Sequence, residues 1–184
     1  MIWFTADTHF CHENVIEHSK RPYTSLEEME LAMISAWNAS VAKGDVVYHL
    51  GDFALSWGVK TKPHILEVFS ALNGTKHLIK GNHDRKEVTT LPWASVSDYK
   101  ELKVDLGGPH KQRIVLCHYA LRTWNQMHRG SWMLHGHSHG SLPDHGGKII
   151  DVGIDRFPHL VNIPEVAWIM ESRGVFAEDH HQPE

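Results

Sequence analysis

Three histidines stand at alternate positions in the segment LHGHSHG, which covers residues 134–140. They are His135, His137 and His139, and glycines stand beside them. Imidazole is the side chain that proteins most often use to bind metal ions. Because one such cluster does not complete a metal site, the remaining ligands have to come from other parts of the chain.

Polar residues of the same kind follow several other short apolar runs. These runs are rich in Val, Ile, Leu or aromatic residues, as β-strands are, and in open α/β sheets binding sites form where strands end. The candidates, in chain order, are Asp7, His9, Asp52, Asn82, His83, Asp84, His118, His137 and His139. The set offers oxygen and imidazole donors and no pair of thiolates, which favours manganese, iron, zinc, nickel or cobalt over a structural zinc site.

The spacing of these candidates has a geometric consequence. In an extended segment alternate side chains point the same way, so Asp7 and His9 can reach one ion together, and so can His137 and His139. The neighbouring glycines let the backbone turn close to a metal without a Cβ in the way. Asp52 ends a central run and is the expected bridge, since one carboxylate can use both oxygens.

The elements that must position these residues can be outlined from periodicity. Strands are expected over residues 1–7, 45–52, 76–84, 113–119, 131–140 and 148–155, and helices over residues 25–41, 62–74 and 163–172. Helices between the first strands predict parallel pairing and an α/β layered fold. The later strands have no long helices between them, which indicates that part of the sheet system is antiparallel. We expect one domain over residues 1–184.

Composition limits the classes of function. No apolar run approaches the roughly 20 residues of a membrane span, and Cys11 and Cys117 do not make a disulfide framework, so a cytoplasmic protein with reduced thiols is expected. A formal charge of −4 argues against charge-driven binding to long nucleic acid but leaves a small nucleotide open. The sequence does not indicate the oligomeric state.

At this point the chain resembles a known family. The blocks Asp7-x-His9, Gly51-Asp52, Gly81-Asn82-His83-Asp84, His118 and Gly136-His137-x-His139 are similar, in content and order, to those of the calcineurin-like metallophosphoesterases. The resemblance runs to about residue 155 and is strongest to small bacterial and phage-type members, whose N-terminus reads like the segment from Asp7 to Asn14. It implies a four-layer α-β-β-α sandwich of mixed sheets flanked by helices.

The resemblance also implies a role for each residue. One divalent ion, with manganese favoured, would take Asp7, His9, Asp52 and His139, and a second would take Asp52, Asn82, His118 and His137. A metal-bridging hydroxide would attack phosphorus, and His83 would be the general acid, its ring oriented by Asp84. His12, Asn14 and Arg21 are weaker candidates for substrate contacts.

Two departures bear on the substrate. The phosphoprotein phosphatases of this superfamily follow GD with a VDRG-type segment and have GNHE, whereas this chain reads GDFALSWG and GNHD. There is also no obvious cap domain of the kind that large nuclease members add. A small phosphodiester or nucleotide is the favoured substrate; a phosphomonoester, and a non-catalytic scaffold of the same fold, are the alternatives.

Overall fold

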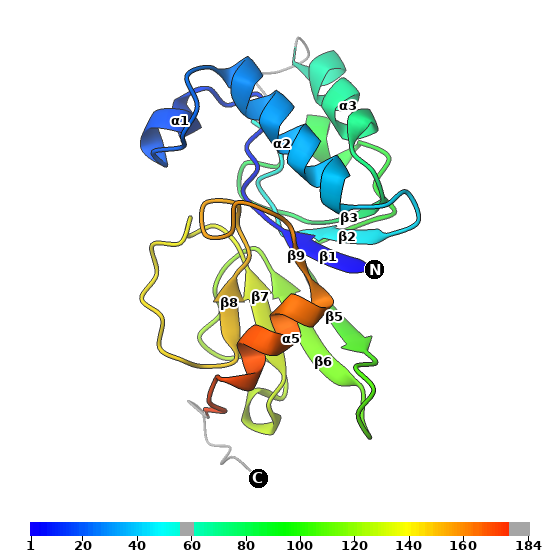
Figure 1. The fold of residues 1–184 in the computed structure, drawn as a ribbon, viewed down its shortest axis with the longest axis vertical. Coiled ribbons are helices and arrows are strands. Elements are labelled where there is room, and N and C mark those ends of the chain that lie inside the picture. The colour runs from blue at the N-terminus through cyan, green and yellow to red at the C-terminus, as the bar shows by residue number, and fades with distance from the viewer. Residues whose placement is uncertain (56–60, 177–184) are drawn as a thin grey trace.

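The computed structural model describes residues 1–55 and 61–176. The last residues of the segment GDFALSWG therefore lie outside the described part of the chain. Two mixed β-sheets face one another and helices flank them (Figure 1), which confirms the predicted fold class.

The first sheet carries the N-terminal strands. Its strands, in spatial order, are β4 (Ser95–Ser97), β3 (Thr75–Ile79), β2 (Val46–His49), β1 (Ile2–Thr5) and β9 (Val161–Asn162). The first four are parallel to one another, as the intervening helices predict, and β9 joins β1 antiparallel. The carboxyl ends of β1, β2 and β3 therefore meet at one edge of the sheet.

The second sheet brings in the histidine segment. Its order is β5 (Tyr99–Val104), β6 (Gln112–Cys117), β7 (Trp132–His135) and β8 (Ile149–Asp151). Only β5 pairs antiparallel, while β6, β7 and β8 are parallel. Fully buried residues such as Phe4, Leu116 and Leu134 fill the space between the two sheets, so the sheets are held together by a shared apolar core.

Helices cover the outer face of the first sheet. Helix α2 (Leu26–Ser40) and α3 (Lys62–Ala71) pack on it through buried residues that include Trp37 and Ile65 (Figure 1). The hydroxyl of Ser25 accepts a hydrogen bond from the backbone N–H of Glu28 at 3.2 Å and so caps the start of α2, where the helix was expected to begin. The reciprocal half of a capping box is replaced, because Glu28 bonds to Thr24 instead.

The C-terminal helix α5 (Ile163–Glu171) contacts β1 and β9 and adds Val166 and Met170 to the core between the sheets. The outer face of the second sheet is covered by the segment from residue 119 to 131, which contains the short helix η1 (Met127–Arg129). Sequence patterns did not indicate β4, β5, β9, α1 (Asn14–His18) or α4 (Lys86–Thr89). These elements are short or lack a clear apolar period. In the described part of the chain, no helix has the length and apolar character needed to cross a membrane.

Candidate metal centre

Two groups of candidate ligands form where the strands of both sheets end. Asp7, His9 and His139 make one group, and Asp52, His118 and His137 make the other; within each group the ligand atoms lie within 4.8 Å of one another. The groups draw on segments after β1, β2, β6 and β7. The structure thus brings together residues that are up to 132 positions apart in the sequence.

Asp52 lies between the two groups. Its Oδ2 is 3.7 Å from Nε2 of His9 in the first group and 3.4 Å from Nε2 of His118 in its own group. Asn82 joins the second group, since its Oδ1 lies 3.1 Å from Nε2 of His118. The side chain of Asp52 is only 2% exposed, so its charge faces imidazoles rather than water.

The backbone presents these ligands in a way that the spacing did not predict. Strand β1 ends at Thr5, so Asp7 and His9 are not in an extended segment; their φ angles are 57° and 50°. His137 and His139 lie beyond β7 with φ angles of 68° and 48°. The expectation of extended alternation is therefore wrong at both places. Left-handed backbone is costly for residues other than glycine, and it clusters at functional sites.

Glycines allow the close approach of these turns. A Cβ on Gly81 would lie 2.2 Å from Oδ1 of Asp52, and a Cβ on Gly136 would lie 2.8 Å from Oδ2 of Asp7. Both distances are too short for real atoms, so any side chain there would push a candidate ligand away. This agrees with the expected reason for glycines beside the ligands.

The burial and the hydrogen bonding of the candidate ligands indicate a binding site for cations. Nε2 of His9 is buried and has no hydrogen-bond partner, which is costly for a polar atom unless a ligand meets it. Burial lowers the pKa of His9 to about 2 and raises the pKa of Asp7 to about 7. Carboxylates and neutral imidazoles within one small volume fit two divalent metal ions, which would both supply the missing partner and neutralise the acids.

A second layer of polar contacts holds His139. Its Nδ1 donates to Oδ2 of Asp155 at 2.6 Å, and this bond raises the pKa of His139. The hydroxyl of Ser19 lies 3.1 Å from the same nitrogen. A histidine whose Nδ1–H is held by a carboxylate points Nε2 at the metal and is a better ligand.

Arg21 completes this layer instead of facing the substrate. Its guanidinium pairs with both oxygens of Asp155 and donates to the backbone carbonyls of Asp7 and Thr8 at 2.6 and 2.9 Å. A fifth contact goes to the sulfur of Met29. All five N–H donors of the group are therefore used inside the protein, and the residue is 7% exposed. The sequence made Arg21 a weaker candidate for a substrate contact; in the structure it is buried and supports the loop that carries Asp7 and Thr8 instead.

His83 and His12 lie over the first group. The ring centroid of His83 is 5.3 Å from that of His9 and 6.2 Å from that of His12. Nδ1 of His12 lies 3.2 Å from Nδ1 of His9. Both residues are partly exposed, so a substrate can reach them. Asn14 is exposed at the start of α1, and among the described residues no hydrogen bond joins its side chain to either ligand group.

Asp84 does not orient the ring of His83. Its carboxylate accepts hydrogen bonds from the backbone N–H groups of Asp52, Phe53 and Gly81 at 2.8, 2.9 and 2.8 Å. In the described residues, no hydrogen bond joins it to the His83 ring. The expected orienting role is therefore not what the geometry shows. Asp84 ties the loop after β3 to the loop after β2, and burial raises its pKa to about 6.

Three contributors were missed by the sequence reasoning. Asp151 accepts a hydrogen bond from the backbone N–H of Gly140 at 2.9 Å and so fixes the end of the histidine segment. Asp155 accepts the hydrogen bond from Nδ1 of His139. The ring centroid of Tyr119 lies 4.7 Å from that of His137. Asp151 and Asp155 belong to the run KIIDVGID. The rule that polar residues after apolar runs form the site would have found them.

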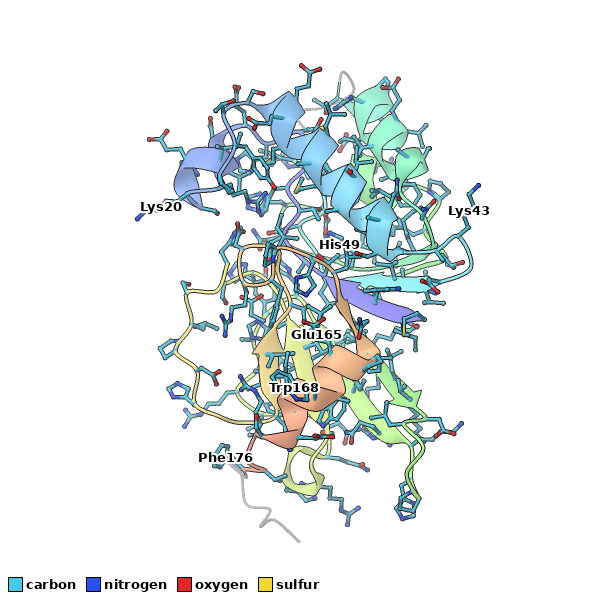
Figure 2. All side chains as sticks on the ribbon, in the orientation of Figure 1. Lys20, Lys43, His49, Glu165, Trp168 and Phe176 are labelled. Carbon is cyan, nitrogen blue, oxygen red and sulfur yellow. The ribbon has the colours of Figure 1, made fainter. Side chains whose placement is uncertain are left out.

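His49 supports the site from inside the first sheet. It is fully buried, and its Nε2 lies 2.9 Å from the hydroxyl of Thr8, which in turn donates to the carbonyl of Phe53 at 2.8 Å. Thr8, in the loop after β1, is thereby joined both to β2 and to the loop after β2. A separate cavity of about 720 Å³ lies beside α5, where Figure 2 labels the lining residues Glu165, Trp168 and Phe176. None of the metal-ligand candidates lines it.

Comparisons with known proteins identify the family of this chain. The family model for the calcineurin-like phosphoesterase superfamily domain matches residues 1–153. An uncharacterized protein of Methanocaldococcus jannaschii is 32% identical over 143 residues, which are 78% of this chain and 72% of that protein. The gene 66 protein of a Mycobacterium phage is 30% identical over 190 residues, covering 90% of this chain and 93% of the phage protein.

A crystal structure has the same fold. A protein of unknown function from Aquifex aeolicus superposes with a TM-score of 0.70 at 24% identity, covering 92% of this chain and 98% of that chain. The family match, the two ligand groups and the mixed sheets lead to one conclusion. The chain belongs to the calcineurin-like phosphoesterase superfamily, a family of metal-dependent phosphoester hydrolases.

Proposed function

We propose that this chain hydrolyses a small phosphodiester, of the size of a nucleotide, with two bound divalent metal ions. Manganese is the expected metal; iron, zinc, nickel and cobalt suit the same donors. The observation that carries the proposal is the position of Asp52. This residue belongs to the group with His118 and His137, and its Oδ2 lies 3.4 Å from Nε2 of His118. The same oxygen lies 3.7 Å from Nε2 of His9 in the other group, so one carboxylate is close to both.

The residues divide the work between holding metals and handling the substrate. Asp7, His9, Asp52 and His139 would hold one ion, and Asp52, Asn82, His118 and His137 the other. When bound, a pair of divalent ions acidifies a water nucleophile and screens the charge of the phosphoryl oxygens. The chain contributes fixed ligand positions, because Asp84, Asp155 and Arg21 hold the loops and rings by hydrogen bonds.

His83 is the proposed general acid. It stands beside His9 rather than within either ligand group, and its ring is partly exposed. From there it would donate a proton to the oxygen that leaves phosphorus, a role worth about 10²–10⁴-fold in rate. His12 lies next to it and lines the same approach. Its pKa is lowered by burial and by the charge of His83, so His12 would be a neutral hydrogen-bonding partner for the substrate.

Arg21 gives no support for a monoester substrate. A monoester carries one more negative charge than a diester at neutral pH, and a free guanidinium could bind its extra oxygen charge by paired hydrogen bonds. Arg21, the cation expected to meet the substrate, has all five donors used by Asp155, Met29 and two backbone carbonyls. It is therefore not available for that role.

The test compares bis-nitrophenyl phosphate with nitrophenyl phosphate on the manganese-loaded protein. We expect a higher kcat/KM for the diester. A higher value for the monoester would favour the phosphomonoesterase alternative. Absence of turnover of either compound, in protein that metal analysis shows to be loaded, would favour a non-catalytic scaffold. Asp52→Asn is the control and should lose metal at both positions together with any turnover.

A further inference from the structure

A third group of potential metal ligands lies outside the dinuclear centre. Cys11, Glu30 and His64 each offer one ligand atom, and the three atoms lie within 4.8 Å of one another. Cys11 comes from the loop after β1, Glu30 from α2 and His64 from the first turn of α3. No local sequence motif joins them, so the group exists only because the loop and the two helices pack together.

Glu30 is the centre of this group. It is 6% exposed, and each of its two carboxylate oxygens bonds to a different residue. Oε1 accepts the backbone N–H of Cys11 at 2.7 Å, and Oε2 lies 2.7 Å from Nε2 of His64. Within residues 1–55 and 61–176, no lysine or arginine pairs with this carboxylate. In the metal-free protein both oxygens of Glu30 are therefore bonded, and the cation that pairs with it is the imidazole of His64, whose pKa this contact raises. A metal ion would take the place of the proton between His64 and Glu30 and would supply a stronger partner for the buried carboxylate.

Cys11 is held in a conformation that does not suit it. Its φ angle is 62°, in the left-handed region where glycine is the cheap choice and a cysteine is not. The residue is partly buried, and its side chain lies against Glu30. Residues kept in unfavourable backbone conformations often mark functional positions. A ligand role for the thiol gives a reason for a cysteine at this place.

The donors define which ion would bind. One thiolate, one imidazole and one carboxylate are the set that zinc accepts in tetrahedral sites, with bonds of about 2.0–2.3 Å. The three atoms would need to move closer together, and the ring of His64, whose side chain is 51% exposed, has room to turn. Two anionic ligands would neutralise a dication.

We propose that Cys11, Glu30 and His64 bind a divalent ion of the zinc type, separate from the dinuclear centre. Binding releases two protons to solvent, the thiol proton of Cys11 and the ring proton that His64 directs at Glu30. The ion ties the loop that carries Asp7 and His9 to α2 and α3, so its role is structural and does not depend on the proposed phosphodiesterase activity. Sulfur distinguishes it from the dinuclear centre, whose candidate ligands are carboxylate, amide and imidazole groups.

Cobalt is the probe for the experiment. A thiolate bound to Co²⁺ gives a charge-transfer band in the near ultraviolet, whereas oxygen and nitrogen ligands do not. Because the sequence has two cysteines, Cys11 and Cys117, the band can only come from one of them. We expect metal-free protein titrated with Co²⁺ to develop this band, Cys117→Ser to keep it and Cys11→Gly to lose it.

Cys11→Gly is the sharpest variant, because glycine adopts a φ of 62° without strain. Loss of the band therefore cannot be ascribed to a distorted loop, and circular dichroism checks that the fold is kept. Metal analysis after zinc loading should show one ion fewer in Cys11→Gly than in the wild type. Thermal unfolding should show a smaller gain in Tm on adding zinc.

His64→Ala supplies an independent arm. It removes an exposed ligand and should require at least about ten times more cobalt for half-saturation of the band, since even residues behind a metal ligand cost this much. His145→Ala, which changes another exposed histidine, is the matched control and should titrate like the wild type. No band in the wild type would overturn the proposal. So would a band that survives in Cys11→Gly or is lost in Cys117→Ser, and so would equal titrations for His64→Ala and the wild type.

Discussion

The side chain of Asp84 accepts a hydrogen bond from the backbone N–H of Asp52 at 2.8 Å. The same carboxylate also receives the N–H groups of Phe53 and Gly81, and the backbone N–H of His83 returns a bond to Oδ1 of Asp52 at 2.8 Å. The loop after β3 and the loop after β2 are thus locked to each other. The carboxylate that was expected to orient a catalytic histidine instead fixes the position of the expected bridging ligand.

Asp84→Asn should therefore weaken the fold and the metal centre. An amide NH₂ group would face a backbone N–H, leaving a buried donor without an acceptor, at a cost of about 1–3 kcal/mol in the free energy of unfolding. Urea unfolding of the metal-free variant would measure this. The dependence of rate on the leaving group should stay as in the wild type. A variant with unchanged stability but an altered leaving-group dependence would restore the orienting role for Asp84.

The pKa of Asp7 predicts a pH dependence of stability in the metal-free protein. Burial raises this pKa from 3.8 to about 7. A carboxyl group whose pKa is raised by folding stabilises the fold while it is protonated, so its contribution is complete below about pH 4 and is lost as pH rises through about 7. Between these values the wild type should lose up to about 1.4 kcal/mol per pH unit relative to Asp7→Asn.

Urea unfolding of both proteins across this pH range checks the prediction, and parallel curves would contradict it.

The proton that binds to Asp7 also competes with a metal ion for this carboxylate. Asp7 must be ionised to bind an ion, and His118 and His139, whose pKa values are raised by their bonds to Asp52 and Asp155 against the effect of burial, must be neutral. Metal affinity should therefore fall as pH drops below about 7. The lowered pKa of His9 keeps that ligand neutral throughout.

Asp155→Asn should lower the affinity of one metal site more than that of the other. The substitution weakens the bond that holds Nδ1 of His139 and removes the charge paired with Arg21. Loss of such a supporting carboxylate costs about 10–100-fold in metal affinity, so calorimetric titration should show one weakened site and one close to wild type. Asp98→Asn, at an exposed ion pair with Lys80, is the control. Equal weakening at both sites would show that Asp155 acts on the whole loop system.

His83→Ala should separate catalysis from metal binding. His83 lies outside both ligand groups, so the variant should retain two ions, whereas His137→Ala or His139→Ala should lose one. An alkoxide leaving group needs a proton and should slow by about 10²–10⁴-fold in His83→Ala. A nitrophenolate leaves without protonation and should slow much less. Equal slowing of the two substrates, with both ions bound, would assign His83 to holding the phosphate instead.

The sequence alone was enough to predict much of this fold. Apolar runs of four to eight residues end in polar clusters, and this pattern located the strands that meet at the site because strand ends share one edge of a sheet. Ser25 before an apolar helical period predicted the start of α2, since a hydroxyl caps the free N–H groups there. Short elements such as β9 and α4 carry too few residues for a period to be seen.

The kinds of ligand at the site could also be predicted from the sequence, but the directions of their side chains could not. Residue type fixes what Asp7, His9 and His139 can bind, and the sequence shows the types. Their left-handed φ angles depend on contacts with glycines and loops elsewhere in the chain.

Partners far apart in sequence are decided only by tertiary packing. Arg21 meets Asp155 across 134 positions, and a guanidinium near the metal loop could have faced either the substrate or the interior. The sequence determined that a cation would be there, because residue type sets charge. The packing of the segment after β8 beneath the loop after β1 decided that this cation is buried and paired, because a hydrogen bond forms only where the fold brings donor and acceptor within about 3 Å of each other.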